Sequence, residues 1–236
     1  MRLPQPLVSG TLVNRYKRFL ADVRMNDGQV VTAHTPNTGS MLGCSTPGMR
    51  VWLSRADNPK RKYPWTWELT EADYGLLVGI HTGRSNGLVW ETVDAGIVPE
   101  LAGYRPLRRE VAVANARLDI LLQNDAGRTC YVEVKNVTAV DKEGRAFFPD
   151  AISTRASRHL KELAALVAAG HRAVIFFCVQ RGDARRLTPA DAIDPAYGQT
   201  LRRVLEHGVE ALAWQAKVGL EEIVLQQALP VELPEL

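Results

Sequence analysis

Two short apolar segments in the middle of the chain each carry an acidic residue. Residues 118–122 and 131–135 are rich in branched side chains, which is typical of buried β-strands. Asp119 is the only charge in the first segment, and the second contains Glu133 and Lys135. Because successive strand residues point to opposite faces, Glu133 and Lys135 share one face. The chain must therefore fold into a sheet that carries charged side chains within apolar strands.

The spacing of the two segments predicts how they pair. If residues 125–127 form a three-residue hairpin loop, Asn124 lies opposite Arg128, and Asp119 lies opposite Glu133. The β-carbons of such a cross-strand pair lie about 4.5–5.5 Å apart. A loop shorter by one residue would shift the pairing and send Glu133 to the other face.

Two carboxylates at that distance repel each other, and an apolar sheet gives them little water. A divalent cation prefers hard oxygen ligands and makes such a pair tolerable. The alternative is a cluster of ion pairs on a solvated face, in which Lys135 and Arg117 neutralise the acids. Because both acids lie inside apolar strands, the pattern favours a metal site at Asp119 and Glu133.

The charge of the chain is concentrated in its N-terminal third. Residues 1–82 hold 10 Lys/Arg and 6 Asp/Glu, a net charge of +4, whereas the remaining 154 residues hold 19 and 20, a net charge of −1. A small basic module is typical of polyanion binding. The charge pattern therefore indicates that the N-terminal part binds nucleic acid.

Neither the cysteines nor the apolar runs indicate secretion. The three cysteines are far apart and form no zinc-binding spacing, the N-terminus lacks a signal-peptide pattern, and the run 173–179 is too short to span a bilayer. We expect a cytoplasmic protein that does not act at a membrane. Homo-oligomerisation is left open by the sequence.

The N-terminal part has an all-β pattern. Alternating apolar residues and turn residues predict five short strands within about eighty residues, and this number suits a small closed barrel of the OB type. We expect this domain to comprise residues 1–82. The strands are expected at residues 19–24, 29–34, 50–54, 65–69 and 76–80.

A basic segment within the barrel lies beside aromatic residues. Arg55, Lys60 and Arg61 precede Trp65 and Trp67. Cations next to aromatic rings suit attraction of the phosphate backbone and stacking of bases from single strands. The alternative is that the two tryptophans face the barrel core, and we expect at least one of them to do so.

The second domain is expected to comprise residues 83–236 and to mix helices with strands. A helix should begin at a Ser85 or Asn86 cap and end near Ala95. The apolar patterns that follow predict the order β-β-β-α-β, with a further helix and two strands. These elements are expected at residues 107–114, 117–124, 129–137, 154–169, 173–179, 195–207, 211–214 and 223–229.

Several motifs in register make the sequence similar to the sugar fermentation stimulation protein A family of bacteria and archaea. The motifs are Pro36-Asn37-Thr38-Gly39-Ser40-Met41, Arg117-Leu118-Asp119, Tyr131-Val132-Glu133-Val134-Lys135-Asn136, Phe148-Pro149-Asp150-Ala151, Thr154-Arg155 and His159-Leu160.

This resemblance implies an α+β or α/β protein in which an OB-fold-like barrel precedes a mixed-sheet domain of the PD-(D/E)xK restriction-endonuclease type. It also implies DNA binding, with DNA that is single-stranded, duplex or structured, and a link to the regulation of sugar metabolism, especially of maltose.

The resemblance assigns residues to a nuclease site. Asp119 and Glu133 would bind Mg²⁺ or Mn²⁺, with the Val134 carbonyl as a third oxygen ligand, and Lys135 would orient the attacking water or counter charge on the phosphate. Glu91 matches the position of an additional acid in many such nucleases. An exposed helix glutamate explains Glu91 equally well.

Further residues are candidates for contacts with DNA. Arg155, Arg158 and His159 lie at the start of a helix, where phosphate is attracted. For His159, a structural hydrogen bond is the alternative. Asn37 and Ser40 flank Gly39 in a loop that could contact nucleic acid, although turn chemistry explains them nearly as well.

Two functions of different classes follow. The first is a Mg²⁺-dependent DNA endonuclease that cuts phosphodiester bonds with Asp119, Glu133 and Lys135. The second is a DNA-binding regulator of sugar metabolism genes that uses a nuclease-like fold without catalysis. The retained acids and lysine favour the enzyme, because a protein that only binds DNA does not need facing carboxylates.

Overall fold

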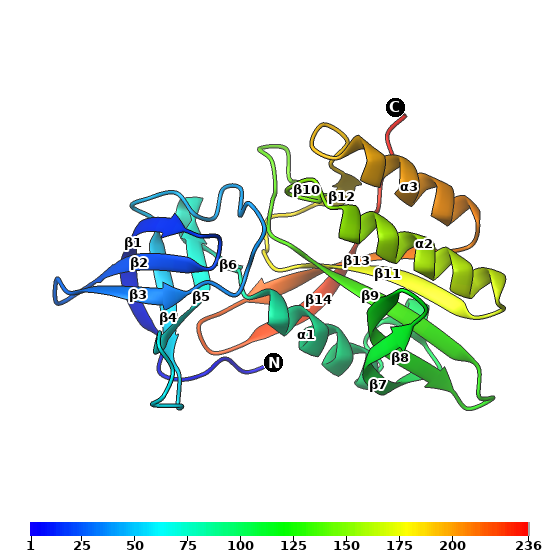
Figure 1. Cartoon of the computed structure of the whole chain (residues 1–236), viewed down its shortest axis with the longest axis horizontal. Helices are drawn as coiled ribbons and strands as arrows, with labels where there is room; N and C mark the ends of the chain where they lie inside the picture. Colours follow the sequence, from blue (N-terminus) through cyan, green and yellow to red (C-terminus); the bar gives the residue numbers. More distant parts are fainter. Residues whose placement is uncertain (236) are drawn as a thin grey trace.

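The computed structural model of the chain describes residues 1–235, and its N-terminal strands close into a barrel (Figure 1). The strand order is β3-β2-β1-β4-β5-β6, and an additional pairing of β3 with β5 closes the first five strands. In the part of the chain that the structure describes, β6 pairs only with β5 and lies outside the closed set. This is the OB-type arrangement expected from the sequence. The strands are β1 Val8–Tyr16, β2 Leu20–Met25, β3 Val30–His34, β4 Arg50–Arg55, β5 Trp65–Ala72 and β6 Leu76–Gly79.

The six-stranded sheet has one strand more than the sequence pattern predicts, because β1 was not expected. Its register shifts between Leu12 and Asn14, so the regular alternation of apolar residues is broken. Gly10 packs so closely on β2 that an added Cβ would lie 2.6 Å from Val23. Trp67 is fully buried in the barrel core and Trp65 is partly buried against it, so one tryptophan belongs to the core as predicted.

A second sheet has the order β14-β13-β11-β9-β8-β7. The pairs β9–β11 and β11–β13 are parallel, and the remaining pairs are antiparallel, so the sheet is mixed as predicted. Its strands are β7 Tyr104–Val113, β8 Ala116–Asn124, β9 Thr129–Val137, β11 Arg172–Val179, β13 Glu210–Val218 and β14 Ile223–Leu229.

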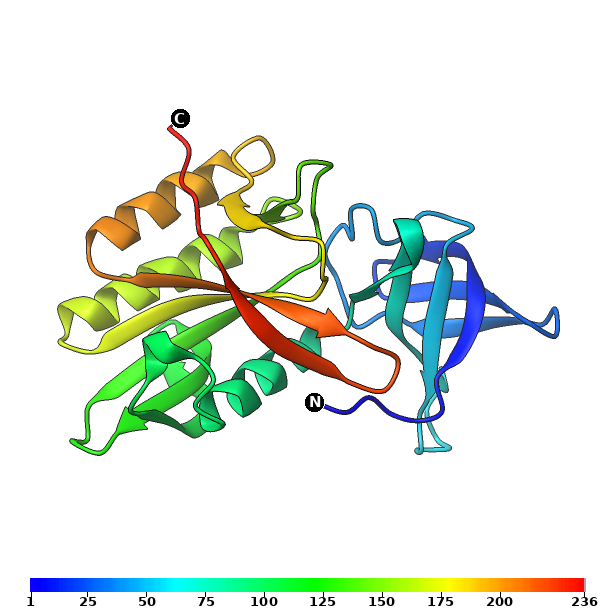
Figure 2. The same cartoon turned by 180° about the vertical axis from the view of Figure 1, so that it is seen from behind.

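Helices cover both faces of this sheet (Figure 2). α1 (Thr82–Asp94) packs on one face through Leu88 and Val89, whereas α2 (Thr154–Ala168) and α3 (Pro195–Glu206) pack on the other. α2 connects the parallel strands β9 and β11, and α3 connects β11 and β13. β11 is therefore buried on both sides, as its continuous apolar run predicts.

The helix boundaries agree with the sequence except at the start of α1. The Ser153 side chain caps α2 by accepting a hydrogen bond from the Ala156 amide at 3.1 Å. α1 begins at Thr82 and not at Ser85 or Asn86, and its N-cap residue, His81, makes no side-chain capping bond. No helix within residues 1–235 is long and apolar enough to cross a membrane.

Two short strands and two 3-10 turns were not predicted. β10 (Arg145–Phe148) and β12 (Arg186–Pro189) form a separate parallel pair. The turns are η1 (Asp73–Gly75) and η2 (Pro99–Leu101). Each element is too short for its periodicity to be recognised in the sequence.

A buried ion pair joins the barrel to α1. Glu68 on β5 is 2% exposed and accepts bonds from Arg84 Nε at 2.7 Å and Arg84 Nη2 at 2.8 Å. Ser54 Oγ donates a third bond to Glu68 at 2.7 Å. Burial alone would raise the pKa of Glu68, but the bonds from Arg84 and Ser54 outweigh it and hold the pKa below its usual value. The stability of the folded state therefore depends on Arg84, which neutralises this carboxylate.

Replacing Arg84 with methionine should destabilise the chain by about 3–5 kcal/mol, because it leaves a buried charge without its partner. Urea unfolding at neutral pH measures the change. The matched control is Arg50→Met, because Arg50 pairs with Glu71 at 3.8 Å on the surface. That variant should lose at most about 1 kcal/mol. Equal losses in the two variants would contradict the importance of the buried pair.

Candidate functional site

The hairpin between β8 and β9 has the predicted register. The Asn124 amide donates to the Arg128 carbonyl at 3.0 Å, and Gly127 adopts a φ of 76° within the three-residue loop. The paired residues run from Gln123–Thr129 to Ile120–Val132. The next residues on the two strands are Asp119 and Glu133, so the two acids face each other across the hairpin.

Asp119 is held by one side chain and one backbone amide. Its Oδ1 accepts a bond from Asn86 Nδ2 at 2.7 Å, and its Oδ2 accepts one from the Val134 amide at 2.8 Å. Burial, followed by the neighbouring charge of Glu133, raises the pKa of Asp119 to about 6. This carboxylate therefore lies where its negative charge is unfavourable.

Glu133 is more deeply buried, at 3% exposure. Its Oε1 accepts bonds from Lys135 Nζ at 2.5 Å and from His159 Nδ1. Burial raises the pKa of Glu133, but the bonds from His159 and Lys135 outweigh it, so the net shift is downward. Its Oε2 has no hydrogen-bond partner among the described residues. One buried acceptor at the site is therefore unsatisfied.

The sequence left open that Lys135 and Arg117 neutralise the two acids as ion pairs. The structure agrees with this alternative only for Lys135. Lys135 does neutralise Glu133, but Arg117 does not join the acids. The side chain of Arg117 is 67% exposed and lies 3.5 Å from Glu110. Among the described residues, Asp119 therefore forms no ion pair, and the Oε2 atom of Glu133 has no hydrogen-bond partner.

The structure does not bring Glu91 to this site. Glu91 lies on α1, is largely exposed, and forms an ion pair with the Met1 ammonium group at 3.1 Å. Asn86 on the same helix contacts Asp119 instead. Glu91 follows Asn86 by five residues, which places it about 140° further around the helix axis. Its prediction as a metal ligand is therefore wrong, and the exposed helix glutamate is the better description.

Asp119 and Glu133 can together hold a divalent cation whose other ligands are waters. Within residues 1–235 there is no group of three or more His, Cys, Asp or Glu side chains arranged to hold a metal. The site nevertheless offers Asp119 oxygens and the unsatisfied Oε2 of Glu133, which are the hard donors that Mg²⁺ prefers. Mg²⁺ usually keeps several waters and takes few protein ligands, so two carboxylates are an adequate set.

These residues form the floor of a pocket with a volume of about 360 Å³. Both domains line it. The barrel contributes Asn37, Thr38 and Gly39 from the loop between β3 and β4, while the second domain contributes the remaining walls. The residues from the second domain are Thr82, Gly83, Ser85, Asn86, Asp119, the segment 133–139, Phe147, Phe148, Asp150 and Arg155.

Two of the predicted DNA contacts are buried. His159 is 3% exposed and is bonded to Glu133, so it is a structural partner of the site and not a phosphate contact. Asn37 is 5% exposed, and its side chain donates to the Ile80 carbonyl at 3.2 Å and accepts from the Gly39 amide at 2.9 Å. Both residues thus make the structural hydrogen bonds considered as the alternative from the sequence, and Asn37 also lines the pocket.

The other predicted contacts remain accessible. Arg155 and Arg158 are exposed at the start of α2, and Arg155 lines the pocket. Arg155 Nε lies 3.4 Å from His159 Nε2, so it is placed next to the residue that holds Glu133. Ser40 is also exposed and donates to the Asp150 carbonyl at 2.5 Å.

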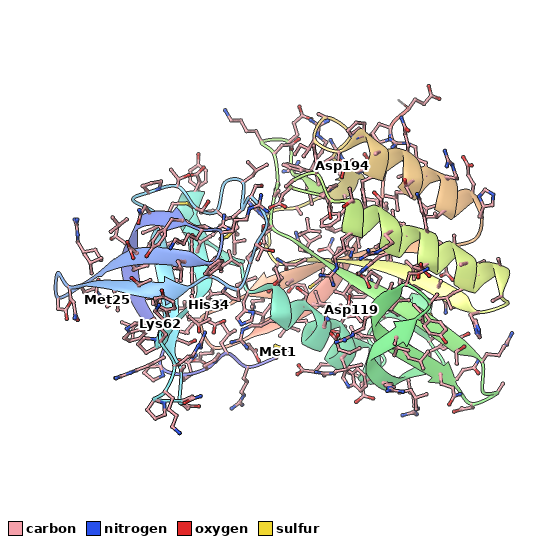
Figure 3. All side chains as sticks on the ribbon, viewed as in Figure 1. Met1, Met25, His34, Lys62, Asp119 and Asp194 are labelled. Atoms are coloured by element: carbon pink, nitrogen blue, oxygen red, sulfur yellow. The ribbon has the colours of Figure 1, made fainter. Side chains whose placement is uncertain are left out.

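The basic residues of the barrel form a second surface. Arg55 lies over the Trp65 ring at 5.9 Å, Arg61 Nη1 donates to Thr66 Oγ1 at 2.9 Å, and Lys60 is exposed. A pocket of about 520 Å³ lies beside Arg55 and is lined by Lys62, Tyr63 and Trp65 among others. Figure 3 labels Lys62 on the barrel and Asp119 in the second domain, well apart along the long axis.

Sequence reasoning missed a buried polar network beside the acids. Gln180 is fully buried and donates to Asn136 Oδ1 at 2.5 Å and to Ser85 Oγ at 3.0 Å, and Ser85 Oγ donates to Asn136 Oδ1 at 2.9 Å. Asn136 follows Lys135 and lines the pocket. The detectable signal was a polar residue directly after the apolar strand β11, because such a residue needs a buried partner.

Both domains of the chain match models of known protein families. A family model described as the sugar fermentation stimulation protein RE domain matches residues 83–222, and one described as the SfsA N-terminal OB domain matches residues 13–80.

Individual relatives match almost end to end. The chain is 58% identical over 234 residues to the sugar fermentation stimulation protein homolog of Pelobacter propionicus, covering 99% of this chain and 100% of that protein. It is 55% identical over 235 residues to the homolog of Thioalkalivibrio sulfidiphilus, with 99% and 98% covered. The structure of Pyrococcus furiosus SfsA in complex with Ca²⁺ matches with a TM-score of 0.89 at 29% identity, covering 98% of both chains.

Without divalent cations, an Asp119→Asn variant should become more stable than the wild type as the pH rises. The folded pKa of Asp119 is about 6, against about 3.9 in an unfolded chain. Between these values only the folded state keeps the proton, so the stability of the wild type falls with rising pH. The difference should grow by about 3 kcal/mol between about pH 4 and about pH 7. Urea unfolding in EDTA measures it, and a difference independent of pH would contradict the electrostatic account.

Proposed function

The chain belongs to the sugar fermentation stimulation protein family, and we propose that it is a divalent-metal-dependent nuclease that hydrolyses phosphodiester bonds of DNA. One observation carries this proposal. Two buried carboxylates face each other beside a lysine, and one of their oxygens has no hydrogen-bond partner within residues 1–235. A protein that only bound DNA would not need this unfavourable arrangement at the base of a pocket.

Asp119 and Glu133 are the residues that would hold Mg²⁺ or Mn²⁺. Such a cation supplies Lewis-acid chemistry that neutralises charge on the scissile phosphate. The Ca²⁺ complex of the Pyrococcus furiosus relative supports the binding of a divalent cation in this family. The hydrogen bonds from Asn86 and from the Val134 amide fix the orientation of the Asp119 carboxylate in advance.

Lys135 supplies the positive charge of the site. Its ammonium group is mostly buried beside Glu133, where it is positioned to orient the attacking water or to stabilise charge that develops on the phosphate. His159, on α2, bonds to the same Oε1 atom of Glu133. The lysine therefore acts on the substrate, whereas the histidine positions a carboxylate.

DNA binding is assigned to both parts of the chain. Residues 1–82 would hold the nucleic acid through Arg55, Lys60 and Arg61 beside Trp65, because cations and aromatic rings attract the backbone and stack bases. Residues 83–236 would cut it, with Arg155 and Arg158 contacting phosphates at the start of α2. The net charge of the N-terminal part, +4 from 10 basic and 6 acidic residues, supports this division.

Removal of either carboxylate should abolish metal-dependent cleavage. Asp119→Asn and Glu133→Gln keep the side-chain shape but remove the charge that holds the cation, so cleavage of labelled DNA in Mg²⁺ or Mn²⁺ should fall to background. Lys135→Ala should reduce the rate by about 10²–10³-fold, as expected for a lost electrostatic donor. Glu91→Gln is the matched control, because Glu91 is exposed and outside the pocket, and it should cleave like the wild type.

Two results would contradict the nuclease. The first is an absence of cleavage of single-stranded, duplex and branched DNA by the wild type with either metal, combined with no metal binding in calorimetry. The second is wild-type cleavage by both carboxylate variants, which would locate the activity elsewhere. The first result would leave a DNA-binding protein without catalysis.

Charge reversal on the barrel should weaken DNA binding. The triple variant Arg55→Glu, Lys60→Glu and Arg61→Glu removes phosphate contacts, so its binding constant should fall and depend less steeply on salt. Fluorescence anisotropy across a salt series measures both quantities. A control with the same charge change on exposed residues elsewhere should keep the salt slope. It combines Lys142→Glu, Arg203→Glu and Lys217→Glu. An unchanged slope in the first variant would assign binding to Arg155 and Arg158 instead.

A further inference from the structure

The acids lie at the bottom of a pocket whose rim is built partly from the barrel. Glu133 is 3% exposed, and the Lys135 side chain is 12% exposed. The pocket above them measures about 360 Å³, which is near the lower end for sites that enclose one small ligand. A substrate phosphate must therefore enter the pocket to reach Asp119 and Glu133.

One barrel loop, residues 36–41, runs along the rim, and we name it the bridging loop. Its first end is fixed to α1. The Pro36 carbonyl accepts bonds from Thr82 Oγ1 at 2.6 Å and from the Thr82 amide at 3.2 Å. Asn37 Nδ2 donates to the Ile80 carbonyl at 3.2 Å. In Figures 1 and 2 this loop lies between the barrel and the second domain.

The second end of the bridging loop is fixed to the segment after β10. Ser40 Oγ donates to the Asp150 carbonyl at 2.5 Å, and the Met41 amide donates to Asp150 Oδ2 at 2.9 Å. Gly39 packs so tightly there that an added Cβ would lie 2.7 Å from both carboxylate oxygens of Asp150. The wall from α1 to Asp150 is therefore continuous and is closed by hydrogen bonds.

Arg15 stiffens the bridging loop from the barrel side. Its guanidinium donates to the carbonyls of Asn37 at 2.8 Å and Gly39 at 2.9 Å, and to those of Arg18 at 2.6 Å and Ser40 at 3.4 Å. Three of these carbonyls, those of Asn37, Gly39 and Ser40, belong to the bridging loop, which is also held at both ends and so has little freedom to move aside. These bonds hold the bridging loop in place at the edge of the pocket.

From this geometry we propose that the bridging loop restricts the site to unpaired DNA, so that the substrate is a single strand or the single-stranded part of a branched molecule. The inference rests on the proposed nuclease function and specifies its substrate class. A pocket of about 360 Å³ is too small to admit a duplex, so a strand whose phosphate reaches the two acids must separate locally from its complement.

The surroundings of the pocket also suit a single strand. Arg155 lines the pocket and can contact a phosphate. On the barrel, Arg55 over Trp65 offers a cation beside an aromatic face, which binds unpaired bases without reading their sequence. A paired duplex hides its base faces from such a surface. The pocket and the barrel surface therefore favour the same substrate, an unpaired strand.

The test compares cleavage of one labelled sequence in three forms: a single strand, a blunt duplex, and a duplex with an unpaired tail. With Mg²⁺ or Mn²⁺ the wild type should cut the single strand and the tail at least about tenfold faster than the duplex, a difference near 1.4 kcal/mol. Cuts in the tailed molecule should map to its unpaired part. Cleavage of the blunt duplex within about threefold of the single strand, below 1 kcal/mol, would overturn the inference.

Release of the bridging loop should reduce this preference. Asp150→Ala removes the carboxylate that holds the Met41 amide, and Ser40→Ala is a milder change at the same contact. Each should lower the ratio of single-strand to duplex rates, with thermal unfolding confirming that the variants are folded. Asp191→Ala is the control, because Asp191 pairs with Arg202 away from the pocket, and it should keep the wild-type ratio. An unchanged ratio in both loop variants would count against the inference.

A binding measurement separates this inference from the nuclease proposal. If no DNA is cut, the nuclease proposal fails, whereas the substrate class is still decided by anisotropy with a fluorescent single strand in Ca²⁺. Thr38 is exposed and lines the pocket, so the larger side chain of Thr38→Trp should narrow its entrance. The affinity for the single strand should fall about tenfold, whereas the affinity for the duplex should stay unchanged. Equal affinities of wild type and variant for the single strand would overturn the inference.

Discussion

The structure depends on the register of one hairpin, which sets two carboxylates against each other inside an apolar sheet. Bonds from α1, α2 and β9 make this arrangement tolerable. α1 supplies Asn86 to Asp119, α2 supplies His159 to Glu133, and β9 itself supplies the Val134 amide and Lys135. These bonds satisfy three of the four carboxylate oxygens. The remaining oxygen explains why we assign a cation to the site.

The barrel and the second domain are joined around this hairpin. The bidentate pair of Glu68 and Arg84 fixes the start of α1 against the barrel, and α1 carries Asn86 two residues later. The bridging loop meets the second domain again at Asp150. The relative position of the two domains therefore determines both the orientation of Asp119 and the width of the pocket above it.

Local patterns predicted the hairpin, the barrel and most of the sheet. The register followed from a three-residue loop ending in Gly127, which can adopt positive φ, and the double-sided burial of β11 followed from its continuous apolar run. The face of α1 that meets Asp119 was not predictable. Asn86 and Glu91 lie on different sides of the same helix, and only tertiary packing determines which side faces the acids. The pairing of β10 with β12 and the contact of Ser40 with Asp150 join distant segments, so no local pattern reveals them.

The central claim is that Asp119 and Glu133 together bind a divalent cation. The most direct measurement is a crystal structure with Mn²⁺, in which anomalous scattering locates the metal without assumptions about its ligands. The account predicts one anomalous peak between the Asp119 carboxylate and Glu133 Oε2, within coordination distance of both. It also predicts that the peak disappears in Asp119→Asn. An empty site at millimolar Mn²⁺, with Lys135 still bonded to Glu133 and the fold unchanged, would contradict it.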